Sequence, residues 1–191
     1  ESVESGKVFS EWRKGNKGAC LSSAFVMAKG AAELEQESDA GAEWLLSYYD
    51  KADDTFTTFS SLGSQKAAKE QAFKKGRTLP QLNPELVKVE VWDSIKTAEE
   101  VRLSKYKGEE ATRVIAILQP LTGEEIFAGS EGNSREKKAS AAGKKSVRPV
   151  WNLTYITTAY NILNIKIDAG TGKVLSDRMS GVMDFMQKDK H

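Results

Sequence analysis

The sequence predicts an α+β protein built from two similar units, each a helix followed by an antiparallel meander of three strands. Alternating apolar residues in short segments indicate strands, and apolar residues three and four positions apart indicate helices. The pattern Trp-x-Leu-(Ser/Thr)-Tyr occurs twice, at residues 44–48 and 151–155. One helix on a three-stranded sheet leaves much apolar surface exposed. We therefore expect the two units to pack together and share a core.

The first unit is expected within residues 1–64. Its helix combines apolar residues at helical spacing with glycines that end it, and its last two strands form a hairpin with a polar tip. The run at 21–30 is apolar and fits a strand, although a helix also fits it. The expected elements are a helix at 3–14 ended by Gly15 and Gly18, strands at 22–29, 44–50 and 55–61, and the hairpin tip DKADD at 50–54.

Residues 65–91 are expected to connect the units. The segment 64–76 has the composition of an amphipathic helix that Gly76 ends, and Pro80 and Pro84 mark a linker. The second unit is expected at 92–191. Its elements are a helix at 92–108 capped by Asp93 or Ser94 and ended by Gly108, strands at 112–118, 150–158 and 162–168, a basic insertion at 129–148, and a C-terminal helix at 180–188.

The stretch IDAGTGKVL, residues 167–175, contains Gly-Thr-Gly-Lys and invites comparison with a phosphate-binding loop. Such a loop needs a glycine five positions before the second glycine, a Ser or Thr after the lysine, and a helix afterwards. Here Ile167 stands five positions before Gly172, and Val174 follows Lys173 in a strand-like segment. Asp168 and the glycines instead suit a tight turn, where glycine adopts positive φ without steric cost. The sequence thus predicts a turn and no nucleotide site.

In this context the stretch resembles the end of a PepSY domain, whose closing pattern is a strand, an Asp-Ala/Pro-x-Thr-Gly turn and a short apolar strand. The resemblance covers about 90–176 and more weakly 5–62, where DKADDT replaces the Thr-Gly turn. The matching residues are Ile165, Ile167, Asp168, Ala169, Thr171, Gly172, Lys173, Val174 and Leu175.

The resemblance to PepSY implies a helix packed on a small antiparallel sheet. PepSY-like domains occur in secreted or envelope-associated bacterial proteins and in the propeptides of thermolysin-type metalloproteases. Their suggested role there is to bind and inhibit peptidases without catalysis. These properties belong to the family, and for this chain they are expectations.

Composition excludes several classes of function. The formal net charge is +1, so the chain as a whole has no general attraction for nucleic acid or anionic membranes. The single cysteine, Cys20, cannot form an intrachain disulfide, and the single histidine, His191, is the last residue. Catalytic Ser-His-Asp or Cys-His groups and histidine-based zinc sites are therefore disfavoured. We predict no catalytic, metal or cofactor residues and no apolar run long enough to span a membrane.

Other candidate residues have ordinary structural explanations. Glu99-Glu100 and Glu109-Glu110 fit solvated helix faces better than acid–base pairs, and DKADD lacks the ligand spacing of a calcium loop. The Asn-Leu-Thr sequence at 152–154 matches a glycosylation acceptor but lies in a predicted strand. Alternation places Trp44, Tyr48, Trp151 and Tyr155 in the core rather than in a binding groove. The basic insertion holds Arg135, Lys137, Lys138, Lys144 and Lys145, which fit a solvated loop better than a site for an acidic partner or nucleic acid.

These observations predict a non-enzymatic binding protein. We expect it to bind an exported protein or peptidase through a sheet edge or the 129–148 loop. The alternatives are a periplasmic or surface module that binds a small apolar ligand, and an enzyme with carboxylate-only chemistry. The chain begins at Glu1 rather than Met. We expect a preceding segment to have been removed, either a signal peptide, which would make the protein secreted or periplasmic, or residues outside the expressed fragment.

Overall fold

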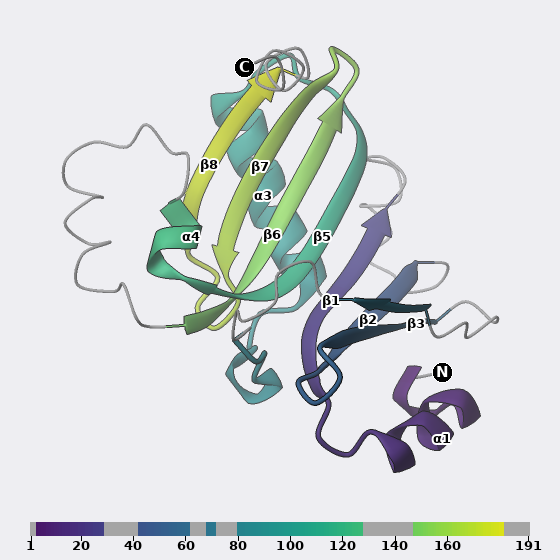
Figure 1. The fold of residues 1–191 in the computed structure, drawn as a ribbon. Helices are drawn as coiled ribbons and strands as arrows, with labels where there is room; N and C mark the ends of the chain where they lie inside the picture. Colours follow the sequence, from purple (N-terminus) through teal and green to yellow (C-terminus); the bar gives the residue numbers. More distant parts are fainter. Residues whose placement is uncertain (1–2, 29–41, 62–67, 72–79, 128–146, 182–191) are drawn as a thin grey trace, which may run out of the picture.

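A computed structural model describes residues 3–28, 42–61, 68–71, 80–127 and 147–181. They form a sheet-dominated α+β fold around one eight-stranded sheet with the strand order β4-β3-β2-β1-β5-β6-β7-β8 (Figure 1). Every neighbouring pair of strands is antiparallel. The sheet therefore consists of two meanders, β1–β4 and β5–β8, that meet where β1 pairs with β5.

The N-terminal half, residues 3–61, follows the expected order closely. A 3-10 turn, η1 (Val3–Ser5), precedes the helix α1 (Lys7–Gly15), which turns Phe9 and Trp12 toward the sheet. The predicted strand at 22–29 is confirmed as far as Ala28, and the alternative helix at 21–30 is wrong over the same residues, while 29 and 30 lie outside the described chain. The strands are β1 (Cys20–Ala28), β2 (Glu43–Asp50) and β3 (Thr55–Ser60).

The predicted helix at 64–76 is wrong at its centre, where the structure has the strand β4 (Ala68–Gln71). This strand pairs with β3, so backbone hydrogen bonds to an open sheet edge outweigh the helical preference of the Ala- and Lys-rich sequence. The remaining parts of the predicted helix, 64–67 and 72–76, lie outside the described residues.

The C-terminal half, residues 91–181, contains the longer helix and strands. The helix α3 begins one residue earlier than expected, with Glu90 at the N-cap position, and ends at Lys105, before Gly108. Ser94 is buried inside it. Asp93 and Ser94 are therefore not caps. The elements are η2 (Pro84–Leu86) in the linker, α3 (Val91–Lys105), β5 (Ala111–Thr122), α4 (Gly123–Phe127), β6 (Val147–Thr157), β7 (Asn161–Asp168) and β8 (Val174–Gly181).

The end of the chain differs from the prediction as well. The expected C-terminal helix at 180–188 is wrong for Ser180 and Gly181, which continue β8 in pairing with β7. Residues 182–188 lie outside the described part of the chain, as does most of the basic insertion at 129–148. The last two residues of that insertion, Val147 and Arg148, belong to β6.

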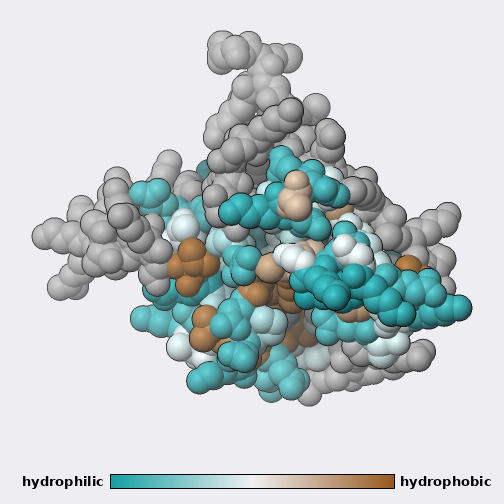
Figure 2. Space-filling view, turned by 60° about the horizontal axis from the view of Figure 1, so that its bottom comes forward, coloured by the Kyte–Doolittle hydropathy of each residue, from teal (hydrophilic) through white to brown (hydrophobic). Residues whose placement is uncertain are grey.

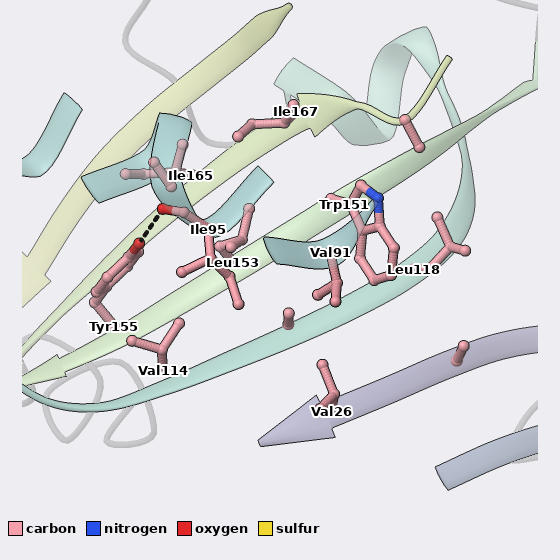
Figure 3. Close-up of a cluster of buried hydrophobic side chains, with 14 of the residues drawn as sticks. Val26, Val91, Ile95, Val114, Leu118, Trp151, Leu153, Tyr155, Ile165 and Ile167 are labelled. Carbon is pink, nitrogen blue, oxygen red and sulfur yellow. Dashed lines mark hydrogen bonds between the residues drawn. The ribbon is translucent and has the colours of Figure 1, made fainter. Parts of the chain in front are cut away.

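The core lies on the face of the sheet that α1 and α3 cover. Figure 3 shows Trp151 beside Val91 and Leu118, and Tyr155 donating a hydrogen bond to the Ile95 carbonyl. Fully buried side chains from the centre of the sheet fill the space under α3. This main cluster includes Val26, Val114, Leu153, Tyr155, Leu163, Ile165 and Ile167. A second, aromatic cluster lies under α1 and consists of Phe9, Tyr48 and Phe59, with Trp12 at its margin.

The linker between the halves crosses the end of the sheet and is tied to it. Leu82 is buried in the main cluster, and its amide donates to the carbonyl of Leu21 at 3.1 Å. The amides of Lys88 and Val89 both donate to the Ala169 carbonyl at 2.9 Å. These bonds hold the described linker residues 80–90, which include η2, against the end of the sheet.

Candidate functional site

The turn between β7 and β8 is held by Asp168. Its Oδ1 accepts the amides of Gly170 and Thr171 at 2.9 and 3.1 Å, and its carbonyl accepts the amide of Gly172 at 2.8 Å. Arg148 Nη1 lies 3.2 Å from Asp168 Oδ2. Gly172 has φ +74, a value that side-chain-bearing residues rarely adopt.

These bonds distinguish a tight turn from a phosphate-binding loop at the Gly-Thr-Gly-Lys sequence. A phosphate-binding loop presents free backbone amides to the ligand, whereas three amides of this turn already have partners within it. The chain then enters β8 instead of a helix. The predicted tight turn is confirmed, and its geometry gives no phosphate cradle.

The turn leads into β8, which is the last strand of the sheet. One edge of β8 pairs with β7, and the other edge pairs with no strand among the described residues. Figure 1 shows α3 behind this part of the sheet and α4 in front of it, beside β8. Side chains of a strand alternate between the two faces. From Ser176 onward the residues of β8 therefore point in turn toward the α4 side and the α3 side, while a register irregularity before Ser176 places Val174 against the main cluster.

On the α3 side, Asp177 ties β8 to the end of the helix. Lys105 Nζ lies 2.6 Å from Asp177 Oδ2, and the Tyr106 hydroxyl donates to Oδ1 at 2.6 Å. Burial opposes ionisation of Asp177, but the two hydrogen bonds and the ammonium charge outweigh it, so the pKa of Asp177 lies below its ordinary value. Burial and the bond to Asp177 raise the pKa of Tyr106 to about 12. The negative charge of Asp177 is thus paired within the protein.

On the α4 side, β8 presents Ser176, Arg178 and Ser180. Ser176 Oγ donates to the Ile126 carbonyl of α4 at 3.2 Å. Lys166, in the next strand, donates to the carbonyls of Glu125 and Ile126 at 2.7 and 2.8 Å, and burial lowers its pKa. Arg178 is exposed. The structure shows no carboxylate paired with Arg178 within the described ranges.

The sequence-predicted aromatic residues lie where alternation places them. Trp151 and Tyr155 are buried in the main cluster and Tyr48 is buried in the aromatic cluster, while Trp44 is half-buried against the main cluster. Trp151 Nε1 donates to the Val89 carbonyl at 2.9 Å, so the linker covers this indole. None of these four side chains lines an open binding groove, and all four take part in packing.

The four glutamates of the Glu99-Glu100 and Glu109-Glu110 pairs differ in exposure and in hydrogen bonding. Glu100 and Glu110 are exposed, as expected. The expectation of solvated side chains is wrong for Glu99, which forms two hydrogen bonds to the buried Arg102. It is also wrong for Glu109, which accepts from Asn161 Nδ2 at 2.9 Å and has one buried oxygen atom without a partner in the described chain. Arg102 also donates to the Glu109 carbonyl, so these side chains brace the connection from α3 to β5.

The other candidates remain structural or fall outside the described chain. Asp50 and Asp54 lie at the β2–β3 hairpin tip, where Asp50 Oδ1 accepts the Ala52 amide and Asp54 Oδ1 accepts the Tyr49 hydroxyl, both at 2.8 Å. Asn152 lies inside β6, as the sequence predicted. Cys20 is a half-buried free thiol. The candidates outside the described residues are Arg135, Lys137, Lys138, Lys144, Lys145 and His191.

Sequence analysis did not identify the charged residues that lie along the β8 edge. Asp177 and Arg178 lie beyond the point where the apolar pattern of Val174 and Leu175 stops, so nothing marked them as strand residues. The continued alternation of Ser176, Arg178 and Ser180 against Asp177 and Met179 was the available signal. Histidine, cysteine and carboxylate side chains do not gather in threes, as metal ligands would, anywhere in the described ranges.

Comparisons with known proteins give one match. No family model and no curated protein matches the chain. A solved structure from Clostridium difficile 630, named there a "putative lipoprotein", aligns with 10% sequence identity over 91% of this chain and 90% of that chain, with a TM-score of 0.43. Separately, the described helices include none with the length and apolar character needed to cross a bilayer.

Proposed function

We propose that this chain is a non-enzymatic exported binding protein that takes an extended segment of another exported protein, a peptidase among the candidates. The single observation that carries the proposal is the outer edge of β8. This strand has eight residues, and no described strand pairs with its outer side. Natural proteins usually shorten or cover such edges, because unpaired backbone groups attract other strands. An extended peptide that pairs with β8 would satisfy those groups.

Side-chain and turn contacts also hold the β8 edge in place before a peptide binds. Asp177 holds β8 to the end of α3, and the Asp168 turn fixes the start of β8 against β7. A strand that is already ordered loses little conformational entropy when a peptide pairs with it. Export and peptidase binding rest on the resemblance of residues 167–175 to PepSY domains.

The proposal includes two PepSY-like units related by an approximate two-fold axis. Trp44 pairs with Val26 in β1, and Trp151 pairs with Leu118 in β5. If the tryptophans are equivalent, Val26 corresponds to Leu118 and Phe25 to Ile117. Phe25 and Ile117 pair directly with each other, which is the arrangement that a two-fold axis between β1 and β5 requires.

The helix ends support the same two-unit proposal. In the last turn of α1, Arg13 donates to the Ala19 carbonyl, immediately before β1. In the last turn of α3, Arg102 donates to the Glu109 carbonyl, shortly before β5. Each arginine thus fixes the connection from the helix to the first strand of its meander.

The test is an NMR titration of the isotope-labelled chain with extended peptides cut from candidate exported proteins. Peptide pairing at β8 predicts saturable shifts concentrated in the amides of residues 174–181, and slower hydrogen exchange there. A substrate screen of the same preparation tests the absence of catalysis. Binding without any response in β8, or turnover that one carboxylate substitution abolishes, would contradict the proposal.

The second candidate is binding of a small apolar ligand, favoured by the sheet face opposite α1 and α3. Leu45, Phe25 and Ile117 are neighbours across three paired strands there and are half-buried. In the view that brings the bottom of Figure 1 forward, Figure 2 shows apolar side chains near the centre of the surface, with hydrophilic side chains around them. In the same titration, a short fatty acid as the probe would then shift amides of β1, β2 and β5 in place of β8.

A further inference from the structure

We infer that the outer edge of β8 selects an extended segment that carries an acidic side chain opposite Arg178, with an apolar residue next to it. This inference rests on the proposed function, because it specifies the side chains of the peptide that the edge would bind. Residues directly opposite each other on neighbouring strands have their Cβ atoms about 4.5–5.5 Å apart, so opposite charges there attract. A carboxylate can also accept two hydrogen bonds from a guanidinium.

Arg178 is the one charged residue of β8 without a charged partner among the described residues. Its neighbour across the β7–β8 pair is Asn164, an uncharged residue whose amide donates to Thr154 Oγ1 at 3.0 Å. The two nearest residues of β8 on the same face are Ser176 and Ser180, which are also uncharged. Because Arg178 is exposed at the middle of the strand, its side chain can turn toward an added strand without breaking a bond to another described residue.

Three other charged residues near β8 have partners, whereas Lys173, just before the strand, is exposed. Asp177 is paired with Lys105 on the opposite face, and Asp168 with Arg148 at the turn. The Lys166 ammonium group is held by two carbonyls of α4. A bound peptide would therefore meet one uncompensated charge in β8, and that charge is positive.

A second copy of this chain cannot supply the acid by pairing β8 with β8. Antiparallel pairing about a two-fold axis perpendicular to the sheet keeps residues of one face opposite residues of the same face. Asp177 lies on the α3 face, whereas Arg178 lies on the α4 face. Arg178 would meet Ser176, Ser180 or another Arg178, and never Asp177. The charge thus favours a different chain as the partner.

The residue next to the acid would point to the α3 face, where Met179 lies. Met179 is half-buried and packs against the main cluster. An apolar side chain opposite Met179 would extend this cluster beyond the edge, and methionine adapts to partners of different shape. The preferred peptide therefore has an acidic residue and an apolar residue side by side, at positions that face Arg178 and Met179.

The experiment uses ten-residue, end-capped Thr/Val-rich peptides that differ at one central position, which is Glu, Gln or Lys. Dissociation constants are measured by NMR titration with the wild-type chain and with Arg178→Gln, Arg178→Glu and the matched control Arg113→Gln. Arg113 is an exposed arginine of β5, so this control removes the same charge away from the edge. We expect the wild-type chain to bind the Glu peptide about threefold to fivefold more tightly than the Gln peptide.

That preference should disappear in Arg178→Gln, turn toward the Lys peptide in Arg178→Glu, remain in Arg113→Gln and weaken with added salt. Equal binding of the Glu and Gln peptides at β8, or a preference that survives Arg178→Gln, would overturn the inference and leave the proposed function standing. Failure of every peptide to shift β8 would overturn both. If sedimentation shows that Arg178→Gln associates with itself, Arg178 instead prevents edge pairing, and the inference is wrong.

Discussion

The two halves of the molecule use the same strand pattern but bury it differently. In the C-terminal half, Trp151 and Tyr155 are 3% and 0% exposed. In the N-terminal half, Tyr48 is buried, but Trp44 is only half-buried. The helices that cover them also differ, because α1 has nine residues and α3 has fifteen. Alternation in a strand decides which face a side chain takes, and the covering element decides how deeply it is buried.

The linker accounts for much of the difference between the tryptophans. Trp151 lies under the linker, to which its indole nitrogen donates a hydrogen bond at Val89. The backbone of Trp44 bonds instead to Ser61, at the end of the N-terminal half. A polar connection with two prolines thus donates no bond to Trp44 among the described contacts but accepts one from Trp151, and this asymmetry can be measured.

The largest expected effect is at the tryptophans. Trp151→Ala should lower the free energy of unfolding by about 3–5 kcal/mol, since it removes a fully packed aromatic side chain. Trp44→Ala should cost less than half as much, because part of its indole already meets water. Chemical denaturation of both variants measures the difference. Equal losses would show that the linker adds nothing to the burial of Trp151.

The arginines at the helix ends give the next comparison. Arg102→Ala should cost about 1–3 kcal/mol, because it leaves the Glu99 carboxylate and the Glu109 carbonyl without their donor. Arg13→Ala should cost about 0.5–1 kcal/mol, since Arg13 is half-buried and its hydrogen bonds go to the neutral carbonyls of Asn16 and Ala19. Thermal and denaturant unfolding measure both. Arg102→Lys is the control, and it should recover part of the loss by keeping the charge.

Sequence predicted most of this fold because the pattern was local. The strands at 44–50, 55–61, 150–158 and 162–168 alternate clearly, and their faces follow from period-two geometry. The predicted helix at 64–76 failed because its composition favours a helix while the open edge of β3 offers backbone partners. That competition depends on tertiary structure, which no local window contains.

The site was harder to predict than the fold. The turn at Asp168 could be derived, because glycine at positive φ and an aspartate that accepts nearby amides are local features. The partners of Asp177 come from α3, some seventy residues earlier in the chain. Glu109 was likewise expected to be a solvated residue, because its partner Asn161 lies 52 residues later in the chain.

Substitutions in the turns of the two halves should lower the free energy of unfolding by a smaller amount. Asp168→Ala should cost about 1–2 kcal/mol, because two amides and Arg148 lose their acceptor. At the β2–β3 hairpin, Asp50→Ala removes one amide bond at an exposed tip and should cost about 0.5 kcal/mol. Asp168→Asn, which keeps an acceptor for the amides, separates the turn bonds from the charge of Arg148. A loss after Asp168→Ala no larger than that after Asp50→Ala would show that the turn is not specially braced.

The smallest expected effect is a pH dependence of the free energy of unfolding, which we expect Asp177 in the C-terminal half to cause. Lys105 and Tyr106 hold the pKa of Asp177 below its ordinary value of about 3.9, so folding favours the ionised carboxylate. A depressed folded pKa gives stability that is complete above the unfolded value and is lost as the pH falls through the folded value. The stability difference between wild type and Asp177→Asn should therefore be constant from pH 5 to 7 and shrink below about pH 4. Denaturant unfolding across this range measures it, with Lys105→Gln as the variant that removes only the cation. A difference that does not change with pH would mean that Asp177 stabilises β8 by hydrogen bonding alone.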